Sequence, residues 1–180
     1  GDDPSCIEYD TMMLEDKLTK INRITALGCT DVVTATNIGA KEAYENHHAD
    51  ILVYLSDDFN RPPQGWDELI VDKARTALKV FGNDRIVSAF KWLLKVNDGV
   101  KDPASPVLTI PIMSRGMYQH LGYTFWHPEY KSMWCDVDLY YSCKEYVYNA
   151  FHIFFKHEHP VTGKCQTDET YERSALNFEQ

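Results

Sequence analysis

The sequence predicts a single α/β domain in which a mixed, mostly parallel sheet is flanked by helices. Three observations indicate this class. The chain has 180 residues, 44% of them hydrophobic, which suits one compact core. Hydrophobic periods typical of helices and of strands alternate along the chain. Residues 49–55 are almost continuously apolar, as in a strand buried on both faces between layers of helices.

The N-terminal third is expected to alternate between helix and strand. Apolar residues recur at helical spacing over residues 9–26, which predicts a helix. The β-branched run at 31–36 predicts a strand, followed by a turn at 37–39 and a helix over 40–48. The apolar strand at 49–55 then stops at the polar sequence Ser56-Asp57-Asp58.

The middle of the chain is expected to resume with a helix after a proline-rich loop at 61–65. Residues 66–81 have an amphipathic pattern and predict that helix. Residues 85–89 predict a strand, and 90–96 either continue it or form a separate strand. Asn97-Asp98-Gly99 has the composition of a turn.

The C-terminal third is expected to add two strands and three helices. We predict strands at 108–113 and 150–157, and helices at 115–121, 137–148 and 167–180. In the strand at 150–157, Phe151, Ile153 and Phe155 share one face. No internal repeat or linker interrupts this pattern, which favours one domain over the whole chain.

Charge and cysteine content narrow the functional class. Eighteen basic and 27 acidic residues give a net charge of −9, whereas nucleic-acid binding relies on Lys and Arg to neutralise phosphates. We therefore expect no nucleic-acid partner.

No apolar run approaches the roughly 20 residues of a membrane helix, and the N-terminus does not resemble a signal peptide. The five cysteines form no CxxC pair, so we expect reduced thiols and a cytoplasmic location.

Two groups of residues have the chemistry of a metal or phosphate site. Asp57 and Asp58 follow the apolar strand, where ligand sites of open α/β sheets form. Their carboxylates suit Mg²⁺ or Mn²⁺, although Asp is also common in turns after strands. His157 and His159 would lie on one face of a strand and so both reach one ion. The alternative for this pair is a solvated strand end.

Asp136 is the candidate for acid–base chemistry. It stands where a helix is expected to begin, so it serves either as a helix cap or as a general base at the rim of a cavity. Considered alone, the position favours the cap.

Taken in order, these segments resemble a glycosyltransferase of the GT-A fold, close to glycosyltransferase family 2. Thr36-Asn37-Ile38-Gly39, with Ala43 and Asn46, resembles the family's Asn-x-Gly helix start. The strand ending in Ser56-Asp57-Asp58 resembles the strand that carries its Asp-x-Asp metal motif, with Ser56 in place of the first Asp. Residues 122–139 resemble its acceptor-side block, in which Cys135-Asp136 replaces a Glu-Asp pair.

The resemblance implies a metal-dependent enzyme that moves a sugar from a nucleotide-diphosphate donor to a saccharide or other acceptor hydroxyl. Asp58, with Asp57, would bind Mn²⁺ or Mg²⁺ and hold the donor diphosphate, and His157 or His159 would complete the metal shell. Asp136 would be the catalytic base. Asp3, which resembles the end of the family's base-binding strand, would contact the donor together with Asn37, Gly39 and Asp57.

We expect the family's first βα unit to be missing from residues 1–180. Its absence would leave a sheet edge uncovered, so we expect either a homodimer or another cover for that edge. Two alternative functions remain at this stage. One is a truncated or degenerate GT-A-like domain that acts as a binding or assembly module. The other is a metal-dependent nucleotidyltransferase or phosphohydrolase, which would use the same Asp and His chemistry.

Overall fold

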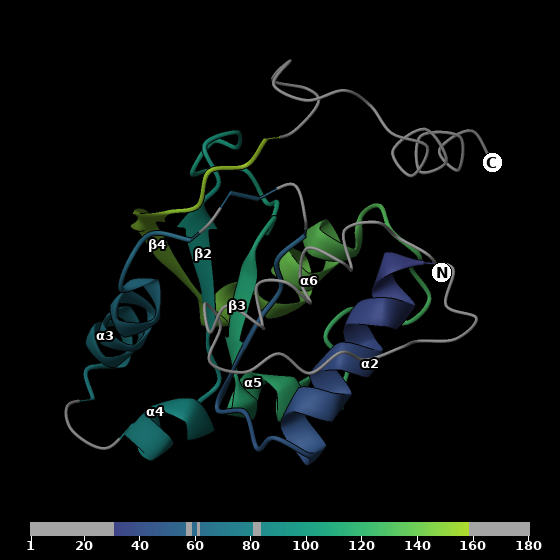
Figure 1. The fold of residues 1–180 in the computed structure, drawn as a ribbon, viewed down its shortest axis with the longest axis horizontal. Coiled ribbons are helices and arrows are strands. Elements are labelled where there is room, and N and C mark those ends of the chain that lie inside the picture. Colours follow the sequence, from purple (N-terminus) through teal and green to yellow (C-terminus); the bar gives the residue numbers. More distant parts are fainter. Residues whose placement is uncertain (1–30, 57–58, 61, 81–83, 159–180) are drawn as a thin grey trace, which may run out of the picture.

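The computed structural model describes residues 31–56, 59–60, 62–80 and 84–158 (Figure 1). The helices predicted at 9–26 and 167–180 lie outside these residues. So do four of the predicted site residues, namely Asp3, Asp57, Asp58 and His159. The predicted domain extent and the missing βα unit therefore stay predictions.

The described strands form one mixed four-stranded sheet in the order β1-β3-β2-β4. The strands are β1 (Ile51–Val53), β2 (Leu93–Asn97), β3 (Pro111–Ser114) and β4 (Val147–Phe154). Strand β3 runs antiparallel to both β1 and β2, whereas β2 and β4 are parallel. The α/β class and the mixed sheet are confirmed, but the expectation of a mostly parallel sheet is wrong for these strands. The connection from β2 to β3 contains no helix, and neighbouring strands joined without a crossover run antiparallel.

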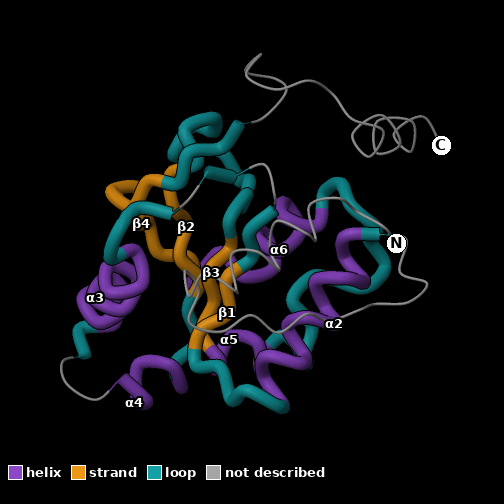
Figure 2. The backbone as a smooth tube through the Cα atoms, viewed as in Figure 1, coloured by secondary structure: helices purple, strands orange, loops and turns teal. Residues whose placement is uncertain are grey.

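Helices cover both faces of the sheet (Figures 1 and 2). Helices α3 (Trp66–Leu78) and α4 (Asp84–Ala89) lie on one side. Helices α2 (Val32–Glu45), α5 (Arg115–His120) and α6 (Cys135–Cys143) lie on the other, and a 3₁₀ turn (Lys144–Tyr146) links α6 to β4. Among the described residues, no helix has the length and apolar character needed to cross a membrane.

Each face of the sheet has its own hydrophobic core, because neighbouring strand residues point to opposite faces. Leu93 belongs to one core and Leu94 to the other. We call the core under α3 and α4 the α3-side core; its buried residues are Ile70, Ala74, Val87, Trp92, Leu94, Val96, Ile110, Ile112, Ala150, Ile153 and Phe155. The α2-side core contains Val33, Ala40, Leu52, Leu93, Leu108, Met113, Met117, Tyr118, Phe125, Trp126, Cys135, Leu139 and Cys143.

The segment 31–36, predicted as a strand, is the N-terminal cap and first turns of α2. The Asp31 carboxylate caps the helix by accepting a hydrogen bond from Thr34 N at 2.7 Å. Val33 and Ala40, seven residues apart, are both buried on the inner side of the helix. The cap and this burial outweigh the strand propensity of the β-branched residues. The turn predicted at 37–39 is consequently part of the same helix.

The segment 85–89, also predicted as a strand, belongs to the short helix α4. A brief apolar run does not distinguish helix from strand. Here α4 packs closely on α5, since a Cβ atom on Gly116 would lie 2.1 Å from the carbonyl oxygen of Ala89. The strand expected at 49–55 is reduced to the three residues of β1, of which only Leu52 is buried. Strand β1 forms one edge of the described sheet.

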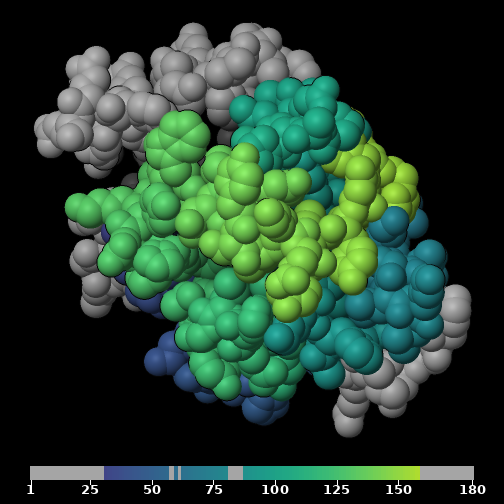
Figure 3. All heavy atoms as spheres, turned by 180° about the vertical axis from the view of Figure 1, so that it is seen from behind, coloured from purple at the N-terminus to yellow at the C-terminus, as the bar shows by residue number. Residues whose placement is uncertain are grey.

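The remaining elements follow the sequence prediction more closely. Helices α3 and α5 match the helices predicted at 66–81 and 115–121. The helix predicted at 137–148 ends instead at Cys143, because the chain from Val147 onward pairs with β2 as β4. Viewed from behind, the chain from β3 to β4 makes up much of the surface, and α2 appears only at its margin (Figure 3).

Candidate functional site

A cavity of about 410 Å³ brings together residues that are far apart in the sequence. We call it the Asp136 cavity. Its polar lining includes Ser56 after β1, Lys101 and Thr109 between β2 and β3, Asp136 in α6 and His157 after β4. Ser56, Asp136 and His157 come from the three segments that the sequence analysis assigned to the metal motif, the base and a further metal ligand.

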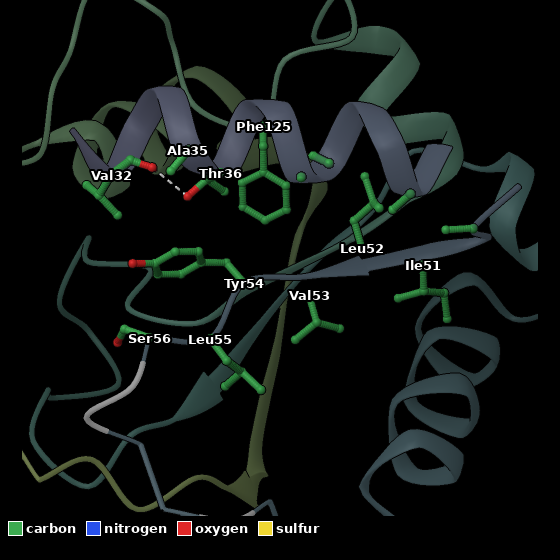
Figure 4. Close-up of a pocket in the computed structure, with 14 residues that line it drawn as sticks. Val32, Ala35, Thr36, Ile51, Leu52, Val53, Tyr54, Leu55, Ser56 and Phe125 are labelled. Atoms are coloured by element: carbon green, nitrogen blue, oxygen red, sulfur yellow. Dashed lines mark hydrogen bonds between the residues drawn. The ribbon is translucent and has the colours of Figure 1, made fainter. Parts of the chain in front are cut away.

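A second cavity, of about 570 Å³, lies between α2 and β1, and we call it the α2–β1 cavity (Figure 4). Its lining is mostly apolar, with Gly39 on the helix and Leu52 on the strand. Both cavities are lined by Val32, Tyr54 and Ser56, so they share a wall. The Tyr54 ring in this wall packs edge-on against Trp126, with ring centroids 5.5 Å apart.

Asp136 is the second residue of α6, and it is not the N-cap. The N-cap is Trp134, whose φ of 70° is unusual for a residue other than glycine. Asp136 Oδ1 accepts a hydrogen bond from the neighbouring Val137 N at 2.9 Å. Burial raises the pKa of Asp136, and this outweighs the opposing effects of the backbone N–H groups and of Lys101. A partly buried carboxylate at a cavity wall with a raised pKa has the properties of a general base.

His157, which also lines the Asp136 cavity, has neighbours that fix its position. Its side chain is buried and stacks on Phe59, with ring centroids 4.2 Å apart and an interplanar angle of 22°. Its backbone N–H donates to the carbonyl oxygen of Asp98 at 3.2 Å. Its Nδ1 atom lies 3.9 Å from Oδ2 of the same residue. The ring position is therefore set by two neighbours, one aromatic and one acidic.

Sequence reasoning missed Asp98, which lies beside His157, as well as Lys101 and Thr109 in the lining of the Asp136 cavity. Asp98 is only 3% exposed, and its carboxylate accepts hydrogen bonds from Val100 N, Lys101 N and Thr109 Oγ1. Burial alone would raise the pKa of Asp98, but the interactions with His157 and these three donors hold it well below its usual range. The turn composition of Asn97-Asp98-Gly99 concealed the residue, although an acidic residue directly after a buried strand was a usable signal.

Asn37 and Gly39 lie on α2 and have different environments. The Asn37 side chain accepts from Phe125 N and Trp126 N at 2.7 and 2.9 Å and donates to the Trp126 carbonyl oxygen at 2.9 Å. It therefore fastens the 125–126 segment to α2. Gly39 faces open space, since a Cβ atom there would meet nothing within 4 Å. Contact of either residue with a donor stays a prediction.

Cys135 occupies the position at which the resemblance expects a glutamate. Its Sγ atom donates to the Ser132 carbonyl oxygen at 2.9 Å. Burial and the adjacent Asp136 raise its pKa to about 12, so it stays a thiol at neutral pH. Cys135 and Cys143 are both free, which agrees with the expected reduced thiols for these two residues.

Within the described ranges, no group of three or more His, Cys, Asp and Glu side chains is arranged to hold a metal ion. Three of the four predicted ligands, Asp57, Asp58 and His159, lie outside those ranges. Two observations fit a cation at the Asp136 cavity. A buried imidazole backed by a carboxylate lines it, as is common for metal-ligating histidines. Ser56, which immediately precedes Asp57, lines the same cavity.

Comparisons with known protein families, curated proteins and solved structures give no match to this chain.

Proposed function

We propose that the chain is a metal-dependent glycosyltransferase with a GT-A-like fold, which transfers a sugar from a nucleotide-diphosphate donor to an acceptor hydroxyl. One observation carries this proposal. Ser56, Asp136 and His157 line a single cavity, although they are widely separated in the sequence. Each belongs to a segment for which the resemblance implies a role in the same reaction.

Asp136 acts as the base in this proposal. Its carboxylate accepts the proton of the acceptor hydroxyl while the hydroxyl oxygen bonds to the anomeric carbon of the sugar. The bond from that carbon to the diphosphate oxygen breaks, and the nucleoside diphosphate leaves with the electron pair. Partial burial makes the carboxylate a stronger base than a fully solvated one, in line with its raised pKa.

The leaving diphosphate requires positive charge, and the chain carries a net charge of −9. A bound Mn²⁺ or Mg²⁺ would neutralise the diphosphate. His157, together with Asp57 and Asp58, would hold that ion. Lys101, which also lines the Asp136 cavity, adds a cationic group of the protein itself.

The two cavities have room for a nucleotide-sugar donor, which consists of a sugar diphosphate and a nucleoside. Their volumes, about 410 and 570 Å³, lie in the range of small-molecule sites. In our proposal the sugar and diphosphate occupy the polar Asp136 cavity. The nucleoside extends along the shared wall toward the mainly apolar α2–β1 cavity, where Gly39 leaves open space.

The test compares Asp136→Asn with Asp138→Asn, since Asp138 is on the same helix turn but lines neither cavity. Release of nucleoside diphosphate from UDP-, GDP- and CDP-sugars is measured with Mn²⁺ and a panel of hydroxyl acceptors. We expect Asp136→Asn to lower transfer by about 10²–10⁴-fold and to leave donor binding intact, while Asp138→Asn stays active. An Asp136→Asn variant as active as the wild type would refute the base role, and turnover that needs no acceptor would indicate a phosphohydrolase.

A further inference from the structure

We propose that Asp98 is a positioning residue for His157. It holds the imidazole in the tautomer with the proton on Nδ1, so that Nε2 keeps its lone pair for a divalent cation in the Asp136 cavity. The cation is the one that the proposed function requires, and to that extent the inference rests on it. The role of Asp98 in setting the tautomer depends only on residues that the structure describes.

The Asp98 carboxylate has a fixed orientation. Its Oδ1 accepts from Val100 N at 2.9 Å and from Lys101 N at 2.8 Å, two backbone donors in the turn that follows β2. Rotation of the carboxylate would break both hydrogen bonds. Oδ2 is consequently the oxygen that faces Thr109 Oγ1, at 2.7 Å, and His157 Nδ1, at 3.9 Å.

The His157 ring has a fixed position relative to this oxygen. Phe59 stacks on one face of the ring, and the His157 backbone N–H is bonded to the Asp98 carbonyl oxygen. Nδ1 is the ring nitrogen that faces Oδ2, and the two atoms lie at the distance of an ion pair, 3.9 Å. A neutral imidazole carries one proton, so a carboxylate beside Nδ1 places the proton there and leaves Nε2 as the acceptor.

This placement of a carboxylate beside Nδ1 resembles the environment of metal-ligating histidines. Their second ring nitrogen donates to a carboxylate or carbonyl group, which fixes the tautomer and increases the basicity of the ligating nitrogen. Asp98 supplies such a carboxylate, and it is buried, so water does not compete for Oδ2. The nearby Lys156 and Glu158 side chains form an ion pair with each other, with Nζ of Lys156 2.8 Å from Oε1 of Glu158.

The first test measures the tautomer directly in the metal-free, full-length chain. Long-range ¹H–¹⁵N correlation spectra are recorded at a pH above the titration of the ring and are assigned with a His157→Gln variant. We expect Nδ1 to have the shift of a protonated nitrogen and Nε2 that of an unprotonated one. The reverse assignment would overturn the proposal, and this measurement requires no change at Asp98.

The second test uses Asp98→Asn. The amide oxygen stays at the Oδ1 position, because Val100 N and Lys101 N both need an acceptor there. The amide NH₂ group then faces His157 Nδ1 and donates a hydrogen bond to it. Nδ1 accepts this hydrogen bond through its lone pair, so the ring proton moves to Nε2. We expect the tautomer to switch and Mn²⁺ affinity, measured from the electron paramagnetic resonance signal of free Mn²⁺, to fall by about 10–100-fold.

Asp102→Asn is the matched control, since it makes the same substitution at an exposed carboxylate in the same loop between β2 and β3, and Asp102 lines neither cavity. It should retain both the Nδ1–H tautomer and the Mn²⁺ affinity. Unchanged Mn²⁺ affinity in Asp98→Asn, despite a switched tautomer, would overturn the proposal. The tautomer measurement and the test of the proposed function can fail independently. Absence of sugar transfer would refute the proposed function, whereas wild-type His157 would still have the predicted tautomer.

Discussion

The two faces of the sheet differ in what their cores do. None of the buried residues of the α3-side core lines the Asp136 cavity or the α2–β1 cavity. The α2-side core, in contrast, contributes Leu52, Phe125 and Ala40 to one cavity and Leu108, Trp126 and Cys135 to the other. The fully buried residues of the α3-side core therefore serve packing, whereas those of the α2-side core also form walls of the candidate site. We therefore expect substitutions in the two regions to differ in their effects on stability and on the candidate site.

The largest effect on stability is expected at Trp92, in the α3-side core. Its side chain is fully buried and its Nε1 donates to the Val87 carbonyl oxygen at 2.9 Å. Trp92→Ala should lower the free energy of unfolding by about 3–5 kcal/mol, since it leaves a cavity and removes this hydrogen bond. Denaturant unfolding measures this, with the exposed Tyr141→Ala as control. Equal stability of the two variants would remove the basis for assigning packing to this core.

A smaller loss is expected where α4 and α5 meet. Gly116→Ala would place a methyl group 2.1 Å from the Ala89 carbonyl oxygen, and because this is backbone, a helix must move. We expect a cost of about 1–3 kcal/mol, as for other overpacked sites. Thermal unfolding monitored by circular dichroism is the measurement. A Gly116→Ala protein that unfolds at the wild-type temperature would contradict this close packing.

Asn37 tests the link between α2 and the segment that lines both cavities. Asn37→Ala removes the acceptor of Phe125 N and Trp126 N, and it should cost about 1–3 kcal/mol if these groups find no other acceptor. Asn46→Ala removes only an exposed hydrogen bond to Glu42 on the same helix, so its cost should stay below about 0.5 kcal/mol. Urea titration of both variants distinguishes them, and equal midpoints would show that Asn37 is not a structural anchor.

The carboxylates of Asp98 and Asp136 should have opposite effects on the pH dependence of stability. The pKa of Asp98 is lowered in the folded chain, so its stabilising effect is present at neutral pH and is lost as the pH falls. The pKa of Asp136 is raised, so its ionisation opposes folding at neutral pH and that penalty disappears in acid. Asp98→Asn should thus be less stable than the wild type at pH 7, and Asp136→Asn equally or more stable. Unfolding measured across pH 3–8 checks both signs.

The smallest effect is expected at Gly39, the counterpart of Gly116. It lies within α2, and a Cβ atom there meets no neighbour. Gly39→Ala should stabilise the chain by about 0.5–1 kcal/mol, because alanine is the better helix former. The same variant sharpens the donor proposal, since the added methyl group projects into the space that we assign to the nucleoside. A thermal shift without ligand, compared with one in the presence of donor, separates the two effects.

Some of this architecture was predictable from the sequence, and the reasons are physical. Helices α3 and α5 have regular amphipathic or capped patterns, and they were predicted close to their actual ends. The strand predictions at 31–36 and 85–89 were wrong, because residue composition describes only a local preference. The Asp31 cap together with packing decided the first segment, and packing decided the second. The direction of β3 could not be read from its sequence, since periodicity does not specify pairing.

The candidate site was predictable to a similar degree. Asp136 and His157 were identified from local patterns, and the structure places both at one cavity. Asp98 was not identified, because its significance depends on His157, which is far away in the sequence and adjacent only in the fold. The shared wall between the two cavities likewise depends on the packing of Tyr54 against the 125–126 segment.

The measurement that tests the central claim most directly is calorimetric titration of the chain with UDP, GDP and CDP, with and without Mn²⁺. The account predicts that at least one of these nucleotides binds, that binding requires Mn²⁺, and that it persists in Asp136→Asn. Absence of binding by all three nucleotides in the presence of Mn²⁺ would contradict the assignment of the Asp136 cavity as a nucleotide-sugar site.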